Sequence, residues 1–214
     1  MDRVQGHEID FRGASFLRPE AKGDLQYGSE HVNLEANCTL EHGLDTRGWD
    51  DEGVPSQRWP IVDRGRFVGF FTDREFASAA GEIELASSSR AEGWYNRPIV
   101  RIPNLSLLPG SGTWRRCWRI PRRRGALSST ASAPGRSTNA ELPVHRQAAW
   151  EVQGGKPGRR QAPTYQGRTL DFWRGCDAVC RPDSRSVRRA ELRQAGNRTR
   201  SRRRTRGGPA RFRG

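Results

Sequence analysis

Metal chemistry in this 214-residue chain would have to come from four histidines and four cysteines. The histidines are scattered, at His7, His31, His42 and His145. No two of them are four residues apart, the spacing at which a helix lets two imidazoles share one metal ion. Position 11 or 12 would have to be histidine for His7-Glu8 to start such a pair, and Phe11 and Arg12 stand there. We therefore interpret His7-Glu8 as a polar surface pair.

Two of the cysteines, Cys176 and Cys180, are four residues apart. That is one helical turn and suits a metal ion, but the two remaining ligands of a four-coordinate site are not evident. We favour buried free thiols over a metal site, because unpaired cysteine behaves as a small apolar residue. Cys38 is expected in the core of a strand, and Cys117 lies in an arginine-rich segment of unusual composition.

A run of three acids, Asp50, Asp51 and Glu52, precedes Gly53. Clustered carboxylates can hold a cation, whereas a run of charges at a turn more often faces water. We favour the solvated turn over metal ligation. A third interpretation, a wall of a substrate channel, comes from a family resemblance described below.

The segments around these acids are predicted to be mostly strands. His31–Leu40 alternates loosely between apolar and polar residues, as a half-buried strand does. The β-rich runs 58–62 and 67–71 are joined by residues 63–66, which include a glycine and indicate a hairpin. Residues 99–108 predict a strand pair or a bent strand. This strand-dominated pattern predicts an α+β fold with mainly antiparallel pairing.

One short helix is predicted after the hairpin. Thr72 fits an N-cap, and Glu75 three residues later completes a capping box. Gly81 is placed to end this helix.

The net charge of +14 is concentrated in two segments. Residues 115–146 hold eight arginines and one acid, and residues 185–214 hold twelve arginines and one acid, which leaves the rest of the chain mildly acidic. Neither segment has apolar periodicity, so both are predicted to be disordered. No apolar run approaches the ~20 residues that span a bilayer, and no signal peptide is expected at the polar start. A cytoplasmic protein with reduced thiols is therefore expected.

The run Trp49–Val62 reads W-D-D-E-G-V-P-S-Q-R-W-P-I-V. It resembles the D-D-E-G-V-P-x-Q-R segment of the TldD/PmbA family of zinc metallopeptidases. The resemblance covers residues 1–114 and 147–184 and includes several motifs in the family's order. These are Gly13–Leu17, Tyr27–Ser29 with Val32-Asn33, Pro98–Arg101 with Asn104, Leu108–Gly110, Gly154–Lys156, Pro163–Tyr165, Asp171–Trp173 and Cys176–Cys180.

The resemblance implies an α+β C-terminal domain over residues 1–184, of which 115–146 is atypical, followed by a basic tail over 185–214. Intact members use zinc, held by an H-E-x-x-x-H helix and a cysteine in an N-C-G-K motif, and act on peptides or unfolded proteins together with a paralogous subunit. Neither motif stands in this chain, so no catalytic residue and no metal ligand is assigned, and no zinc is expected. The resemblance implies only a substrate-channel position for Asp50, Asp51, Glu52 and Gly53.

Translation of a GC-rich gene in a shifted reading frame also produces segments of this arginine-rich composition. Residues 115–120 can be encoded so that a shifted frame reads E-E-M-L-A-D, and residues 131–141 so that it reads K-R-S-W-S-I-D-Q-R-R. Residues 189–194 can likewise be encoded so that a shifted frame reads V-P-N-C-G-K. Each resembles the family's own sequence at that place, so we interpret the chain as a fragment with frame shifts, inactive alone.

A different class of function stays open: a small basic module that binds nucleic acid. Arginine-rich tails attract phosphates without sequence preference. Stacking on bases would use exposed aromatic rings, whereas we expect the tryptophans to be core or domain-interface residues. Those considered are Trp49, Trp59, Trp94 and Trp150. The nucleotide sequence separates the two functions, because only the first requires shifted frames that restore the family motifs.

Overall fold

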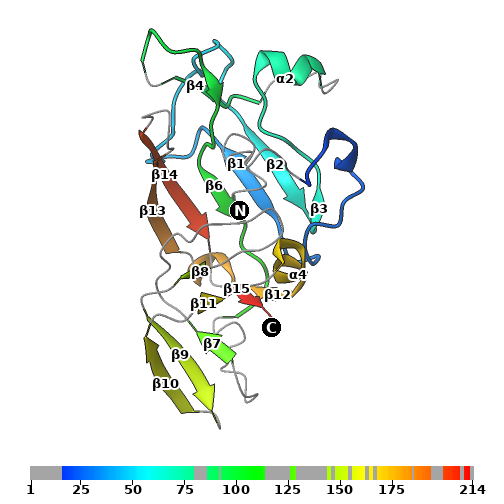
Figure 1. The fold of residues 1–214 in the computed structure, drawn as a ribbon, viewed down its shortest axis with the longest axis vertical. Coiled ribbons are helices and arrows are strands. Elements are labelled where there is room, and N and C mark those ends of the chain that lie inside the picture. Colours follow the sequence, from blue (N-terminus) through cyan, green and yellow to red (C-terminus); the bar gives the residue numbers. More distant parts are fainter. Residues whose placement is uncertain are drawn as a thin grey trace.

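The computed structural model describes residues 16–79, 86–91, 93–113 and 168–184 and, outside these ranges, only the backbone of the strands named below. Figure 1 shows the arrangement of these elements. A twisted sheet lies at the centre, with the helix α2 at one end.

The central sheet has six strands in the order β13-β14-β6-β1-β2-β3. Strand β1 lies in the middle and pairs antiparallel with both β2 and β6. The predicted strand within 31–40 is thus confirmed. Residues 99–108 do hold two short strands, but each pairs with other strands of the chain rather than with the other, so the predicted pair is wrong. The bounds are β1 Leu34–Asn37, β2 Arg58–Asp63, β3 Arg66–Phe67, β6 Leu105–Leu107, β13 Ser186–Arg193 and β14 Arg200–Gly207.

The predicted hairpin is present between β2 and β3. Its two central residues, Arg64 and Gly65, have φ angles of 45° and 77°, so both adopt the left-handed conformation that a tight two-residue turn requires. A Cβ on Gly65 would lie 2.3 Å from the carbonyl oxygen of Gly28. Glycine is therefore needed here both for its φ angle and for the close approach of another backbone.

The remaining elements are short. Helix α2 spans Arg74–Ala79 and helix α4 spans Thr169–Arg174, and no helix in the described part of the chain is long and apolar enough to cross a membrane. The other elements are the 3₁₀ helices η1 Pro19–Ala21 and η2 Pro182–Ser184 and the strands β4 Ser89–Arg90, β5 Ile99–Val100, β7 Ala126–Ser128, β8 Val144–His145, β9 Ala148–Gln153, β10 Lys156–Gln161, β11 Thr164–Tyr165, β12 Cys176–Val179 and β15 Ala210–Phe212.

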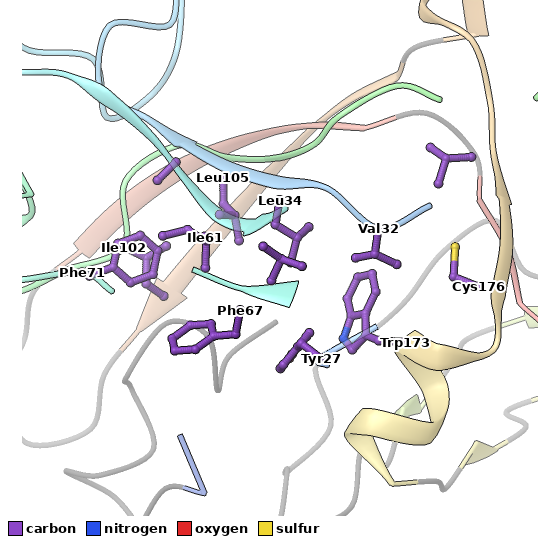
Figure 2. Packing of buried hydrophobic residues seen from close by; sticks show 13 residues of the cluster. Tyr27, Val32, Leu34, Ile61, Phe67, Phe71, Ile102, Leu105, Trp173 and Cys176 are labelled. Carbon is purple, nitrogen blue, oxygen red and sulfur yellow. The ribbon is translucent and has the colours of Figure 1, made fainter. Parts of the chain in front are cut away.

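The core joins segments that are far apart in the sequence. Side chains from β1, β2, β3 and β6 pack with Trp173 of α4, and Figure 2 shows Trp173 between Tyr27, Val32 and Cys176. The Tyr27 and Trp173 rings have centroids 6.3 Å apart. The amide of Ser29 also donates to the carbonyl oxygen of Trp173 at 3.1 Å. This nonlocal packing holds residues 169–180 against the central sheet.

The helix cap differs from the prediction. Helix α2 begins at Arg74, and its cap is Asp73, whose Oδ1 accepts a hydrogen bond from the amide of Phe76 at 2.7 Å. The hydroxyl of Thr72 instead accepts from the amide of Ala86 at 2.8 Å. The prediction of Thr72 as the cap is wrong because tertiary structure uses its hydroxyl elsewhere. Gly81 lies outside the described residues.

The two arginine-rich segments lie largely outside the described residues. In the segment 115–146 the structure gives only β7 and β8. In the segment 185–214 it gives β13, β14 and β15, and β14 joins the edge of β6 in parallel. Strand hydrogen bonds need no apolar side chains, so these backbone pairings are compatible with a segment that lacks apolar periodicity. The packing of these arginine side chains stays a prediction.

Candidate functional site

Asp50 organises the loop that carries the acidic run. Its side chain is 5% exposed, and its Oδ1 accepts hydrogen bonds from the amides of Glu52 at 3.0 Å and Val54 at 2.8 Å. Its Oδ2 accepts from the amide of Ser89 in β4 at 3.2 Å. The carboxylate therefore closes its own turn and ties that turn to a strand 39 residues away.

Asp51 and Glu52 extend the same attachment. Asp51 Oδ2 accepts from the amide of Ala91 at 2.7 Å and lies 3.6 Å from Nε of Arg90. Glu52 Oε2 accepts from the hydroxyl of Ser89 at 2.9 Å and from the amide of Arg74, the first residue of α2, at 3.0 Å. We call Asp50, Asp51 and Glu52 the acidic clamp, because together they fix β4 and the start of α2 to one loop.

The expectation of a solvated turn is wrong for Asp50. The turn is present, and Asp51 is exposed, but Asp50 is buried and its oxygens are occupied by amide donors. Gly53 has a φ of 77° and no atom within 4 Å of an added Cβ, so glycine serves the turn geometry alone. Ligation of a metal ion by Asp50 is disfavoured as well, because its oxygens already accept three amide hydrogen bonds.

A partly buried ion-pair cluster lies next to the acidic clamp. Asp45 pairs with Arg47 and, at 2.8 Å from its Oδ1, with Nη1 of Arg90. The side chains of Asp45 and Arg47 are 12% and 10% exposed, and Arg47 also donates to the carbonyl oxygen of Ser87 at 2.7 Å. Arg90 thus connects this cluster to Asp51. A buried carboxylate needs such partners, since burial of an unpaired charge is strongly unfavourable.

Asn104 anchors the other side of the loop. Its Nδ2 donates to the carbonyl oxygen of Asn37 at 3.0 Å, and its Oδ1 accepts from the amide of Asp45 at 3.1 Å. A Cβ on Gly43 would lie 2.5 Å from Asn104 Nδ2, so this amide is packed tightly. Sequence reasoning placed Asn104 in a family motif but missed Asp45 and Arg90. No local sequence signal identifies them, because Arg90 is 45 and 39 residues from its partners Asp45 and Asp51.

The described cysteines are buried free thiols, as predicted. Cys176 and Cys180 lie along strand β12 and its end rather than on a helix, so their Cα atoms are roughly 13 Å apart at ~3.3 Å per residue. They are too far apart to share a metal ion. Cys38 donates to the carbonyl oxygen of Ser87 at 3.1 Å, and burial raises the pKa of its thiol to about 11 even though Arg47 opposes the rise.

Two of the tryptophans are not core residues, and a position at a domain interface, the other alternative, stays a prediction for them. Trp49 is 67% exposed and Trp94 is 96% exposed, with Tyr95 beside it at 71%. Trp59 packs against the core as predicted, and its Nε1 donates to the carbonyl oxygen of Phe70 at 3.0 Å. The side chain of Trp150 lies outside the described residues. The exposure of these rings could not be predicted from spacing, because Trp94 and Tyr95 lie in a turn and Trp49 in an isolated β-bridge, and neither place has apolar periodicity.

The candidate histidines are not brought together. His31 lies 4.0 Å from Glu30 and His42 lies 3.4 Å from Glu41, each beside its own sequence neighbour on the surface. His7, Glu8 and the side chain of His145 lie outside the described residues. The donors that the structure does describe, two surface imidazoles and three separate buried thiols, do not fit a zinc site.

Residues 4–190 match the family described as the PmbA/TldA metallopeptidase C-terminal domain. The chain belongs to this family. A metalloprotease of Methanocaldococcus jannaschii is 36% identical over 83 residues, which are 39% of this chain and 18% of that protein. A zinc metalloprotease TldD homolog of Saccharolobus solfataricus is 26% identical over 87 residues, or 40% and 19% of the two chains.

Two solved structures share the fold of this PmbA/TldA C-terminal domain. A candidate modulator of a DNA gyrase from Thermotoga maritima has a TM-score of 0.67 at 20% identity, over 97% of this chain and 43% of that one. TldE from Thermococcus kodakarensis has a TM-score of 0.61 at 16% identity, over 97% and 45%. The α+β prediction and the family resemblance are confirmed. The chain spans less than a fifth of the curated relatives and less than half of these solved chains.

Proposed function

We propose that this chain is part of a zinc metallopeptidase subunit of the TldD type and cleaves no peptide by itself. The observation that carries the proposal is the family match over residues 4–190. The metalloprotease relatives support the first part of the proposal. The described imidazoles and thiols support the second part, because a catalytic zinc takes three protein ligands and a water, and these side chains lie apart. The 214 residues contain no H-E-x-x-x-H sequence. No contact among the described residues favours the nucleic-acid module.

The acidic clamp contributes to this function by position. Asp50 has its oxygens occupied by three backbone amides, so it has little capacity left to bind a substrate. We place Asp50, Asp51, Glu52 and Gly53 in the wall of the peptide channel, where they hold β4 and α2 in register. Asp51, the exposed member, is the one that a substrate could reach.

The proposal includes the reading-frame interpretation and a partner. Similarity to the curated relatives extends over only 83 and 87 residues, as expected if other segments are translated out of frame. The intact protein would act in the cytoplasm on peptides or unfolded proteins, paired with a paralogous subunit. Sequencing the gene tests this directly: shifted frames restore R-S-W-S-I-D near residue 135 and N-C-G-K near residue 191. An open frame that restores neither motif would contradict the fragment interpretation.

Peptidase activity provides a second test. The purified chain should cleave no unfolded protein, and a version with both frames and the H-E-x-x-x-H helix restored should gain chelator-sensitive cleavage with its partner. A restored protein that binds zinc yet cleaves nothing would overturn the proposed activity while leaving the family assignment in place.

A further inference from the structure

The strands β4 and β5 form a small hairpin whose turn presents two aromatic side chains to solvent. Ser89 pairs with Val100 and Arg90 with Ile99. Trp94 and Tyr95, here called the aromatic tip, are 96% and 71% exposed. Figure 1 places β4 at the same end of the molecule as α2, away from α4 and β12.

The aromatic tip rests on a fixed base. At the start of the hairpin, the amides of Ser89 and Ala91 donate to the carboxylates of the acidic clamp. At the other side, Arg97 forms an ion pair with Glu75 of α2. The Trp94 and Tyr95 rings meet edge to face, with centroids 5.8 Å apart and planes at 89°. A turn anchored at both ends loses less backbone entropy when it binds a partner than a free loop does.

The arginines described around the aromatic tip are already paired. Arg90 is held by Asp45 and Asp51, and Arg97 by Glu75. A site for single-stranded nucleic acid would combine stacking rings with cations free to track the phosphates, and these cations are neutralised by carboxylates. The chemistry of the tip therefore fits an apolar, uncharged partner.

The size of the surface decides between partners. A stable interface between folded proteins buries about 800 Å² on each side. Two aromatic side chains supply ~300–500 Å² at ~150–250 Å² each. The two rings alone therefore supply less than one side of a stable folded interface, and they match a few apolar side chains of an extended segment.

We propose that Trp94 and Tyr95 form a docking site for short apolar segments of extended polypeptide, and that the acidic clamp positions this site. The inference deepens the proposed function, since it names residues that would hold the polypeptide substrate of such a subunit. It needs neither zinc nor cleavage, so it can be tested on the chain as it exists.

The experiment measures the fluorescence anisotropy of a fluorescein-labelled peptide that alternates leucine and serine, titrated with the purified chain in the presence of a chelator. The double variant Trp94→Ala/Tyr95→Ala should lose at least tenfold in affinity. Trp49→Ala is the matched control, because Trp49 is also exposed but is not on the hairpin, and it should change affinity less than twofold. Circular dichroism of each variant verifies that the fold is kept.

Three results would overturn the proposal. The wild-type chain fails to bind the peptide, the double variant binds as well as wild type, or Trp49→Ala loses as much affinity as the double variant. Sedimentation velocity adds a further outcome: a wild-type dimer that dissociates in the double variant would assign the tip to self-association instead. A preference for a labelled single-stranded oligonucleotide over the peptide would equally contradict it. None of these results bears on whether the family fold or its peptidase activity is present.

Discussion

Replacing Asp50 by alanine should destabilise the domain far more than the same substitution at its exposed neighbour Asp51. The substitution leaves the amides of Val54 and Ser89 buried without their acceptor, and the half-buried amide of Glu52 as well. Each buried donor left unpaired costs ~1–3 kcal/mol, so the two buried amides together give a loss of about 3–5 kcal/mol. That is a large fraction of the ~5–15 kcal/mol by which domains are stable.

The assay is urea unfolding followed by tryptophan fluorescence, with the free energy of unfolding taken from linear extrapolation. Asp51→Ala is the matched control, because Asp51 is exposed and its contacts are one hydrogen bond from the amide of Ala91 and one solvent-exposed ion pair with Arg90, so the substitution should cost less than ~1 kcal/mol. If Asp50→Ala and Asp51→Ala lose similar amounts, both under ~1 kcal/mol, the carboxylate of Asp50 does not hold the loop and the clamp is misassigned.

Two further predictions rest on backbone geometry and on burial. Gly65→Ala should lower the free energy of unfolding in urea by at least ~2 kcal/mol, because the added Cβ would lie 2.3 Å from a carbonyl oxygen. Gly53→Ala has the same φ of 77° but open space around the Cβ, so it should cost about 1 kcal/mol. Equal losses for the two variants would contradict the steric clash at Gly65. Burial raises the pKa of the Cys38 thiol from 9.0 to about 11, so the thiol ionises in the unfolded chain first. Stability should be intact below pH 9 and fall by up to about 3 kcal/mol between pH 9 and pH 11, at ~1.4 kcal/mol per unit. A Cys38→Ala variant that shows the same fall would refute this assignment.

Local features of the fold were predictable from the sequence, and nonlocal ones were not. The β2–β3 hairpin follows from two β-rich runs and one glycine, and its turn has the positive φ angles that such a turn requires. The packing of Trp173 against Tyr27 could not be predicted, because no periodicity relates residues so far apart. Thr72 shows the same limit: its sequence fits a cap, but a contact with Ala86 takes its hydroxyl.

The candidate site shows why residue type alone misleads. Three consecutive acids indicate a solvated turn when each is considered with its neighbours in sequence. Their carboxylates instead accept amides from β4 and α2, and these partners lie more than 20 residues away. Arg90 was missed for the same reason, since its two carboxylate partners are 45 and 39 residues from it and only the folded chain brings them together.

The zinc content of the purified chain tests the central claim most directly. After expression with zinc and dialysis without chelator, atomic absorption should find well below one zinc ion per chain, because the described thiols and imidazoles are separate and a tight site needs about three protein ligands. The same preparation should leave an unfolded protein uncut. One zinc ion per chain, together with cleavage that a chelator abolishes, would contradict the proposal that this chain is only part of a metallopeptidase subunit.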